Sequence, residues 1–251
     1  MWLVLNCFRY GQDQRGSIWE LDLSFGHTTA QPTQIASYHG EPIVGLVAAC
    51  EGHLIASTGD AQLKVSDIAQ RKVMATFPYT VQATSLEWTQ VDNKPANIVV
   101  GFNDGTVRIM SYGKSTASLK PCLIMLQAIR PHGKRVTTIH QAPNSKIIAM
   151  ASTDQTIFFF ELESKGLSPI GFVNATGPVV DFVWRDEATI LAWCSNHTVC
   201  QVSLPSLDQI DTTHSFKINE AKLSGYTFKS CKARLLRQKA KASFDQKYTV
   251  T

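Results

Sequence analysis

The stretch Asp104-Gly-Thr-Val-Arg-Ile-Met-Ser111 decides the fold, because variants of it recur along the chain. The other copies are Gly16-Ser-Ile-Trp-Glu-Leu-Asp-Leu23, Asp60-Ala-Gln-Leu-Lys-Val-Ser-Asp67, Asp154-Gln-Thr-Ile-Phe-Phe-Phe-Glu161 and Asn196-His-Thr-Val-Cys-Gln-Val-Ser203. Aligned on the second turn position, they are spaced by 45, 44, 50 and 42 residues. A period of about 40 to 50 residues, with several short strands in each repeat, is typical of a β-propeller.

The recurring phrase predicts a tight hairpin turn that leads into a strand. Its second position, Gly105 in the copy quoted first, must adopt a positive φ, which Gly, Asn and Asp tolerate at low cost. Thr then opens a strand in which β-branched residues pack well. Ala61, Gln155 and His197 take the second position in three copies and are poorer turn formers, which weakens single copies without changing the period.

Between the turns, the sequence predicts blades of four strands each. In the best-formed unit, residues 135–140 alternate apolar and polar residues, and residues 147–151 form a continuous apolar run. Such patterns indicate a half-buried strand and a strand covered on both faces. In the first unit, residues 2–8 are expected to supply a single inner strand, which leaves that unit incomplete. In the last unit, the fourth strand is expected at residues 210–216.

Charge divides the chain into two parts. The 251 residues carry a net charge of +4. Residues 217–251 hold nine Lys or Arg against two acidic residues, a net of +7, which leaves −3 for residues 1–216. We therefore expect a propeller region over 1–216 and a basic, partly helical tail or linker over 217–251. The length and the 44% hydrophobic content suit a large globular core.

The six cysteines contain no C-x-x-C pair, so no zinc or redox motif is present in the sequence. Free buried thiols in a reducing compartment are expected, and a disulfide between Cys194 and Cys200 is the less favoured alternative. The apolar start at residues 1–8 is too short for a signal peptide or a membrane span and reads as a buried strand. Both observations favour a cytoplasmic location.

The repeated phrases resemble the inner hairpin of WD40-repeat propellers, and Asp104–Ser111 is the best match. The resemblance covers residues 2 to about 216 and implies an all-β, WD40-like β-propeller of about five four-stranded blades. The Trp-Asp dipeptide of the family is nowhere intact, and its Gly-His pair is reversed in His39-Gly40 and His132-Gly133. We therefore expect the polar network of well-formed WD40 blades to be mostly absent here, and the blades to be held chiefly by apolar packing.

Two further expectations follow from the resemblance. WD40 propellers usually close with seven blades, so an array of about five implies part of a larger ring, or a ring completed by another chain. An unclosed array would leave open sheet edges and an exposed apolar face. The degenerate repeats and the basic tail are also similar to the cilia- and flagella-associated WD-repeat proteins of the axoneme.

Catalytic signatures are lacking in the sequence. It has no nucleophile elbow, zinc-protease motif, phosphate-binding Gly loop or nucleotide fingerprint, and its histidines lack metal-ligand spacing. We expect no catalytic, metal or cofactor site, and Asp60, Asp104 and Asp154 are interpreted as turn residues. The tryptophans Trp2, Trp19, Trp88, Trp184 and Trp193 fall on predicted strands and are expected to pack between blades.

Partner contacts are the remaining candidates. Loops on one rim of the disc carry the candidate partner-binding residues His39, Glu41, Arg130, His132, Lys134 and Arg135. The cations crowded at Arg130–Arg135 suit an acidic protein surface. A solvated connection is the alternative interpretation of this loop, and a plain loop histidine that of His39 and His132.

The tail adds the candidates Lys232, Arg234, Arg237, Lys239 and Lys241. These cations could bind tubulin or another acidic protein, bind nucleic acid, or belong to a solvated linker. No aromatic residue lies within the basic run, which argues against nucleic acid.

The sequence thus predicts a non-catalytic scaffold or adaptor. The resemblance implies other proteins as partners, such as scaffold subunits, tubulin or components associated with axonemal dynein, and a place in the cytoskeleton of the cilium or flagellum. A nucleic-acid- or chromatin-associated adaptor and a propeller enzyme with a central-channel site are the alternatives.

Overall fold

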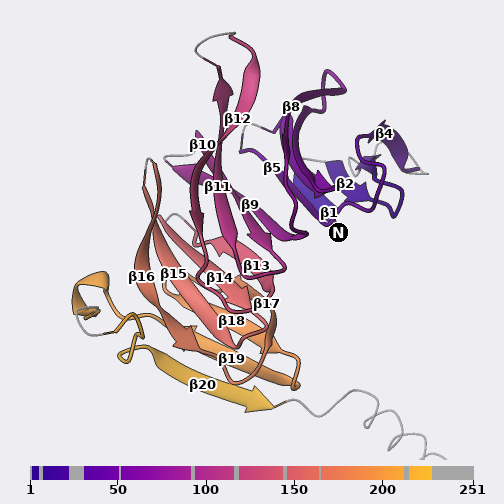
Figure 1. The fold of residues 1–251 in the computed structure, drawn as a ribbon. Coiled ribbons are helices and arrows are strands. Elements are labelled where there is room, and N and C mark those ends of the chain that lie inside the picture. Colours follow the sequence, from indigo (N-terminus) through magenta and orange to yellow (C-terminus); the bar gives the residue numbers. More distant parts are fainter. Residues whose placement is uncertain are drawn as a thin grey trace, which may run out of the picture.

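The computed structural model is an all-β array of five antiparallel sheets with four strands each (Figure 1). It describes residues 2–5, 8–22, 31–50, 52–91, 94–115, 119–143, 146–163, 165–211 and 215–227. We call the sheets blades 1 to 5 in chain order. In each blade the strands follow one another in sequence and neighbouring strands pair. The connection from β19 to β20, residues 204–221, is a long one. The predicted fold class is confirmed.

The strand bounds follow the sequence pattern closely in the middle of the chain. Blade 1 contains β1 (Trp2–Leu5), β2 (Phe8–Gln12), β3 (Ser17–Asp22) and β4 (Thr33–Ser37). Blade 2 contains β5 (Gly45–Ala48), β6 (Leu54–Gly59), β7 (Gln62–Asp67) and β8 (Lys72–Pro78). Blade 3 contains β9 (Ala83–Val91), β10 (Lys94–Phe102), β11 (Val107–Lys114) and β12 (Pro121–Ile129). Blade 4 contains β13 (Val136–Gln141), β14 (Ile147–Ser152), β15 (Thr156–Glu163) and β16 (Gly166–Asn174). Blade 5 contains β17 (Val179–Trp184), β18 (Thr189–Cys194), β19 (Thr198–Ser203) and β20 (Lys222–Thr227), with a 3-10 turn at Leu207–Gln209.

Both ends of the array differ from the sequence expectation. Blade 1 is complete rather than partial, because residues 2–12 supply two strands, with Leu5 paired to Phe8. The prediction that residues 210–216 supply the fourth strand of blade 5 was wrong, and residues 212–214 of that range lie outside the described residues. The fourth strand of blade 5 is β20, which pairs with β19 through Val202 and Leu223 and so lies within the stretch assigned to the tail. The tail beyond Thr227, with all five of its candidate cations, lies outside the described residues.

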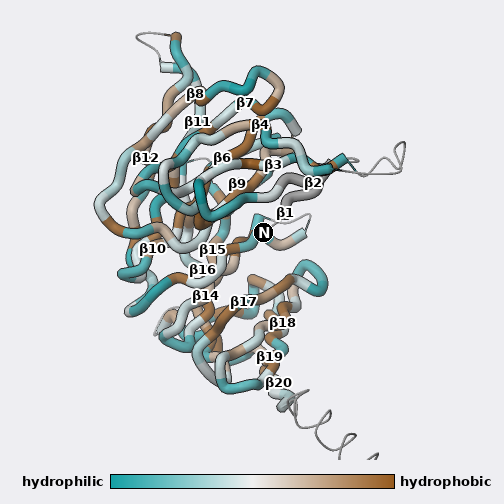
Figure 2. The backbone as a smooth tube through the Cα atoms, turned by 90° about the vertical axis from the view of Figure 1, so that its right-hand side faces the viewer, coloured by the Kyte–Doolittle hydropathy of each residue, from teal (hydrophilic) through white to brown (hydrophobic). Residues whose placement is uncertain are grey.

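Each boundary between blades holds its own apolar cluster. Ile18 and Leu46 belong to the cluster between blades 1 and 2, and Trp88 to the cluster between blades 2 and 3. Ile139 and Phe182 are buried at the next two boundaries. The first strands of successive blades, β1, β5, β9, β13 and β17, contact one another in that order. Figure 2 shows hydrophobic segments along the strands and hydrophilic ones in many connections. Burial of alternate strand residues against the next blade therefore stabilises the array.

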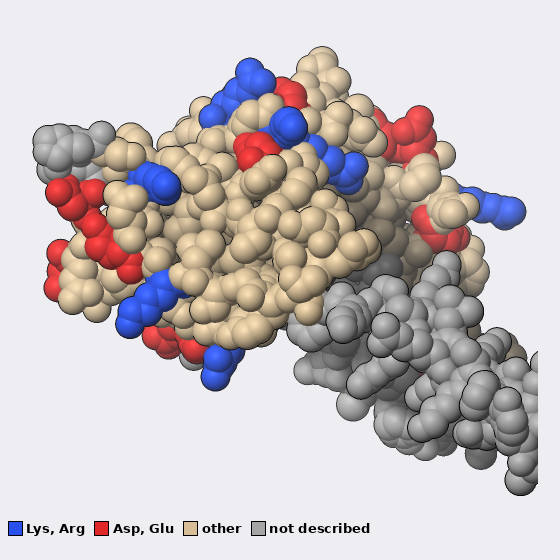
Figure 3. All heavy atoms as spheres, turned by 90° about the horizontal axis from the view of Figure 1, so that it is seen from below, with Lys and Arg blue, Asp and Glu red and all other residues tan. Residues whose placement is uncertain are grey.

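Blade 5 presents a face that no blade covers among the described residues. Cross-strand pairing puts Trp193 beside Val199 and Tyr226, on the face opposite to buried Phe182 and Cys200. Seen from below, near β20, the molecule shows a broad surface without charged side chains (Figure 3). Trp193 was expected to pack between blades, and its exposure follows from this uncovered position.

Candidate functional site

The site is built on the hairpin turns between the second and third strands of each blade. The second turn position has a positive φ in all five copies of the phrase, at Gly16, Ala61, Gly105, Gln155 and His197. These hairpins form one edge of the array, together with the connections between blades at residues 38–44, 79–82, 130–135 and 175–178. We call this edge the turn rim. The predicted hairpin turn is thus present in every blade, even where Ala, Gln or His must adopt the left-handed conformation.

Two glycines of the turn rim are required by close packing as well as by φ. A β-carbon on Gly16 would lie 2.2 Å from the carbonyl oxygen of His39, and one on Gly105 would lie 2.2 Å from that of His132. The turns of blades 1 and 3 therefore press directly on the connections that lead to blades 2 and 4. No larger side chain fits at either position without moving the backbone.

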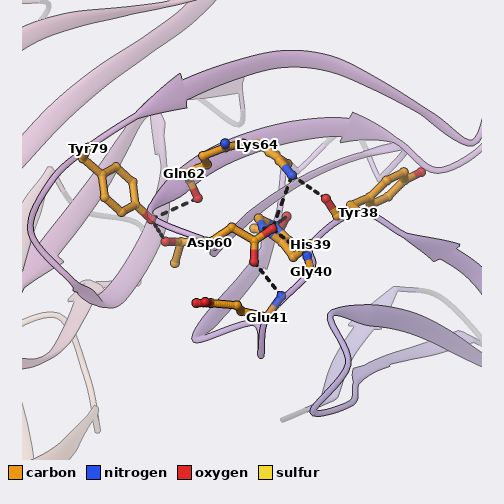
Figure 4. A network of polar contacts seen from close by, with 10 residues as sticks. Tyr38, His39, Gly40, Glu41, Asp60, Gln62, Lys64 and Tyr79 are labelled. Carbon is orange, nitrogen blue, oxygen red and sulfur yellow. Dashed lines mark hydrogen bonds and ion pairs between the residues drawn. The ribbon is translucent and has the colours of Figure 1, made fainter.

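The first of these connections is also held from the other side by blade 2 (Figure 4). The carboxylate of Asp60 accepts hydrogen bonds of 2.6 Å from the backbone N–H groups of Gly40 and Glu41. His39 Nδ1 lies 3.5 Å from Asp60 Oδ2, and its Nε2 lies 2.9 Å from Ser57 Oγ. The connection is thus fixed by the turn of its own blade as well as by Gly16 of the blade before.

Lys64 and Tyr79 extend the network of blade 2. Lys64 Nζ lies 3.7 Å from Asp60 Oδ2 and donates a hydrogen bond to the carbonyl of Tyr38. The Tyr79 hydroxyl donates to the carbonyl of Gln62 at 3.0 Å. These bonds satisfy polar groups that burial would otherwise penalise.

Blade 4 repeats the arrangement. Asp154 accepts a 2.8 Å hydrogen bond from the N–H of Gly133, and its Oδ2 lies 3.5 Å from His132 Nδ1. Thr156 Oγ1 lies 2.8 Å from His132 Nδ1 and donates to Asp154 Oδ1 at 2.5 Å. The Ser152 hydroxyl donates to the Lys134 carbonyl at 3.2 Å. The reversed His-Gly pairs therefore still place a histidine against the aspartate of the turn.

Blades 3 and 5 differ from this arrangement. Asp104 bonds the N–H and hydroxyl of Thr106 within its own turn. In blade 5, Asn196 donates to the carbonyl of Thr176 at 2.9 Å. The prediction that polar links would be mostly absent is therefore wrong for blades 2 and 4, and it fails in part for blade 5. The signal was in the sequence, because His39 and His132 stand 21 and 22 residues before Asp60 and Asp154.

The pKa shifts of Asp60, Asp154 and His39 suit residues that hold the connections in place. Burial opposes ionisation of Asp60, but hydrogen bonds from Gly40 and Glu41 hold its pKa below the usual value. Burial also opposes ionisation of Asp154, but hydrogen bonds from His132 and Thr156 outweigh it and hold its pKa well below the usual value. Burial and the charge of Lys64 lower the pKa of His39, so the ring is neutral at pH 7. The carboxylates are thus ionised anchors for backbone N–H groups.

The candidate residues of the turn rim fall into two groups, buried histidines and exposed charged residues. The side chains of His39 and His132 are buried, with 3% and 2% exposure, so both rings serve the networks in this conformation. Glu41, Arg130, Lys134 and Arg135 are exposed. The three cations share the connection between blades 3 and 4, and Glu41 lies in the connection between blades 1 and 2. That these four bind a partner stays a prediction.

A second polar cluster lies on the inner strands and was missed from the sequence. His140 Nδ1 on β13 lies 3.3 Å from Glu87 Oε2 on β9, and Gln141 and Gln90 exchange two hydrogen bonds of 2.7 Å. The indole N–H of Trp184 on β17 donates to the carbonyl of His140 at 3.0 Å. The alternation of β13 places His140 on the same side as Thr138, a polar register that could have signalled the cluster.

Ser57, His39 and Asp60 are the residue types of a catalytic triad, but the Ser57 and His39 side chains are buried, with 0% and 3% exposure, so a substrate does not reach them in this conformation. Within the described part of the chain, no group of three or more His, Cys, Asp or Glu side chains could hold a metal ion. A cavity of about 590 Å³ between blades 3 and 4 is lined by Val91, Ala96, Asn97, Lys146, Glu161, Leu162 and Glu163. This lining contains no Ser, Thr, Cys or His side chain. Among the described helical residues, no segment has the length and apolar character needed to cross a membrane.

Known proteins resemble this chain in sequence and fold. No family model matches it. Cilia- and flagella-associated protein 44 of Mus musculus is 31% identical over 252 residues, which cover 93% of this chain and 14% of that protein. The chain therefore spans about one seventh of the length of this relative.

Two solved structures share the fold. One is the mitotic checkpoint complex, with a TM-score of 0.62 and 16% identity over 78% of this chain and 58% of that chain. The other is Chaetomium thermophilum Sqt1 bound to the N-terminus of the ribosomal protein L10, with a TM-score of 0.64 and 17% identity over 78% of this chain and 56% of that chain. Together with the five sheets, these matches confirm the WD40-like propeller fold. The similarity to a cilia- and flagella-associated protein confirms the narrower resemblance.

Proposed function

We propose that this chain is a non-catalytic scaffold segment of the cilium or flagellum, which holds other proteins on the turn rim and on the edges of its blades. The observation that carries the proposal is the 31% identity to a cilia- and flagella-associated protein over nearly the whole chain. The rim supports it, because aspartate and histidine side chains are used to fix backbone rather than to form a reactive site. A rim with fixed loops loses little entropy when a partner binds.

The contact surface on the rim is the connection between blades 3 and 4. Arg130, Lys134 and Arg135 are exposed there, while the backbone between them is held by Asp154 and Ser152. Three cations on a fixed loop suit an acidic protein surface, such as that of tubulin or of a component associated with axonemal dynein. Sqt1, which shares the fold, is described as bound to a segment of another protein.

The uncovered face of blade 5 belongs to the same proposal. Val183, Trp193 and Tyr226 are exposed on it, whereas the equivalent faces of the other blades are buried against a neighbour. We assign this face to a further blade, supplied by a longer protein or by another chain. The division into a propeller over 1–216 and a basic tail over 217–251 then shifts, because β20 makes residues 222–227 part of blade 5.

Proximity labelling tests the scaffold role. The chain would be fused to a labelling enzyme and expressed in ciliated and in non-ciliated cells. We expect axonemal proteins among the partners in ciliated cells, and a loss of part of this set when Arg130, Lys134 and Arg135 are all changed to Glu. The matched control changes three exposed cations of connections outside the turn rim, Lys146, Lys165 and Arg185, to Glu. A partner set without axonemal proteins would remove the ciliary assignment.

The nucleic-acid alternative has a separate test. Binding to a labelled single-stranded oligonucleotide would be measured at low and high salt, because several phosphate contacts make affinity fall steeply with salt. We expect no binding at low salt. Tight binding with a steep salt dependence would favour an adaptor that uses the basic tail instead.

A further inference from the structure

The outer edge of blade 4 is already paired with another segment of the same chain. β16 is the outer strand of blade 4, and residues 216–218 run beside it. The N–H of Phe172 donates to the carbonyl of Phe216 at 2.7 Å, and the N–H of Ile218 donates to the carbonyl of Phe172 at 2.9 Å. Ile218 is buried by this pairing. A short extended segment can therefore add to the outer edge of a blade and bury an apolar side chain.

Among the described residues, no segment pairs in this way with the outer edge of blade 3. It is formed by β12, the last strand of its sheet, which belongs to a hairpin that projects from the array (Figure 1). Three consecutive apolar side chains are exposed on it: Ile124 at 53%, Met125 at 46% and Leu126 at 37%. Leu126 falls at a register shift between the pairs Ile109–Gln127 and Met110–Met125. An apolar edge strand of this kind is a template for another strand.

The free part of this edge has a defined limit. The side chain of Gln127 donates to the carbonyl of Leu167 on β16 at 3.2 Å and accepts from its N–H at 2.8 Å. Blade 4 therefore contacts β12 at Gln127, and β8 of blade 2 also contacts β12, with Leu123 packed against the cluster between blades 2 and 3. Among the described strands only β11 pairs with Pro121–Leu126, so the outer side of this stretch is left for a partner. Six residues are enough for a short added strand.

The charged residues that flank the apolar run of β12 indicate which kind of segment it would bind. No charged residue occurs from Pro121 to Ile129, but exposed Lys120 and Arg130 flank this run. The whole stretch 111–135 contains five Lys or Arg and no acidic residue. A second copy of the chain is a poor occupant, because antiparallel pairing centred on Met125 would set Lys120 against Arg130. An incoming strand with acidic residues at both ends is complementary.

We propose that the outer edge of β12 binds an extended segment of another protein, apolar in its middle and acidic at both ends, which adds a fifth strand to blade 3. Backbone hydrogen bonds along Pro121–Leu126 supply affinity, and Ile124, Met125 and Leu126 contact the apolar middle of the segment. Lys120 and Arg130 select the acidic ends. This site deepens the scaffold role proposed above and rests on it for its biological setting alone.

The experiment uses synthetic peptides of about nine residues with alternating Val and Thr in the middle, the form suited to strand addition. The first has two Glu at each end, the second has two Lys at each end, and the third keeps the Glu ends but has Pro at alternate middle positions. Binding to the full chain is measured by fluorescence anisotropy. We expect the first peptide to bind at least about tenfold more tightly than the other two. Equal binding of the Glu-ended and Lys-ended peptides, or no binding of any, would overturn the proposal.

Protein variants locate the site. Met125→Asp should weaken the Glu-ended peptide by about tenfold or more, because it puts an acidic group in the apolar stretch. The matched control is Val183→Asp, since Val183 has 45% exposure against 46% for Met125 but lies on the uncovered face of blade 5. Thermal unfolding of both variants verifies that they fold. Equal loss in the two variants, or none in Met125→Asp, would contradict the site. Peptide binding and proximity labelling are independent readouts, so failure of the site and failure of the scaffold role are distinguishable.

Discussion

Glu87 and His140 join blades 3 and 4 at their inner strands, with Glu87 Oε2 lying 3.3 Å from His140 Nδ1. Burial by itself would lower the pKa of His140, but the hydrogen bond and charge of Glu87, together with the charge of Asp181 on β17, raise it. The boundary between the two blades is therefore stabilised by a histidine whose pKa is raised by its acidic neighbours.

The first prediction concerns this pair. A raised folded-state pKa means that the stabilisation is fully present below the ordinary value of about 6.5 and is lost as pH rises through the folded value. His140→Gln should therefore reduce the free energy of unfolding more at about pH 6 than at about pH 8. Urea unfolding at both pH values measures the difference. Glu87→Gln should show the same trend, and a loss that grows with pH would contradict the assignment.

The second prediction concerns the aspartates of the turns. Asp154→Ala should cost about 2 kcal/mol, because it leaves the N–H of Gly133 without an acceptor and removes one of the two partners of His132 Nδ1. Asp104→Ala is the matched control, at the same position of the phrase, and should cost about 1 kcal/mol because Asp104 bonds only within its own turn in the described contacts.

Acid should remove this difference. The pKa of Asp154 is lowered, so its stabilisation is present above the ordinary value of 3.8 and disappears as pH falls through the folded value. Chemical unfolding of both variants at neutral and acidic pH checks the point. Equal losses at neutral pH would show that the link between turn and connection contributes nothing.

The third prediction separates φ from close packing. Gly105 and Gly52 have similar φ values of 85° and 80°, but a β-carbon at Gly105 would meet the carbonyl oxygen of His132 at 2.2 Å, whereas nothing lies within 4 Å at Gly52. Gly52→Ala should cost about 1 kcal/mol, the strain of the left-handed region alone. Gly105→Ala should cost at least about twice as much. Thermal unfolding of the pair is the measurement, and similar midpoints would argue against the tight approach.

The fourth prediction uses two neighbours on opposite faces of β17. Phe182 is fully buried between blades 4 and 5, and Val183 is exposed. Phe182→Ala should cost about 3 to 5 kcal/mol through loss of burial and the cavity left behind. Val183→Ala should change the free energy of unfolding by less than about 0.5 kcal/mol. A large loss at Val183 would mean that its face is covered in the folded chain.

The fifth prediction concerns association of the purified chain. The uncovered apolar face of blade 5 should promote self-association in the absence of a further blade. Changing both Val183 and Trp193 to Glu should shift the chain toward a monomer in analytical ultracentrifugation. Wild-type protein that is monomeric at about 100 μM, a concentration at which exposed apolar surface promotes aggregation, would argue that the face needs no partner.

Local chemistry made much of the fold predictable. The turn phrase fixed five hairpins because positive φ at one position is a local requirement, met at Gly105 and tolerated at Gln155. The best-formed unit followed from periodicity, since the apolar run in β14 is buried between two blades. The end of blade 5 was missed because Ile210, the two Thr residues and Phe216 favour a strand locally, whereas the choice of β20 depends on distant pairing with β19.

The side-chain contacts of the turn rim were harder to predict from the sequence. His39 and Asp60 belong to different elements and are brought together only by the packing of a connection on a turn. The expected rim cations were correctly placed at the surface, but the expected histidine contacts proved to be buried. The exposed run at Ile124–Leu126 could not be told from a buried strand, because a string of apolar residues looks the same in both settings.

The connection at His39 and Gly40 is held from two sides. Gly16 of one repeat packs closely against it, and Asp60 of the next repeat accepts a hydrogen bond from it. A single sequence repeat is therefore not an independent building block, since excising it at either phrase removes half of the support for its entry loop. The smallest piece expected to keep its native loops is a pair of adjacent blades. Engineering by insertion, deletion or shuffling should accordingly exchange such pairs and leave the shared connection within them intact.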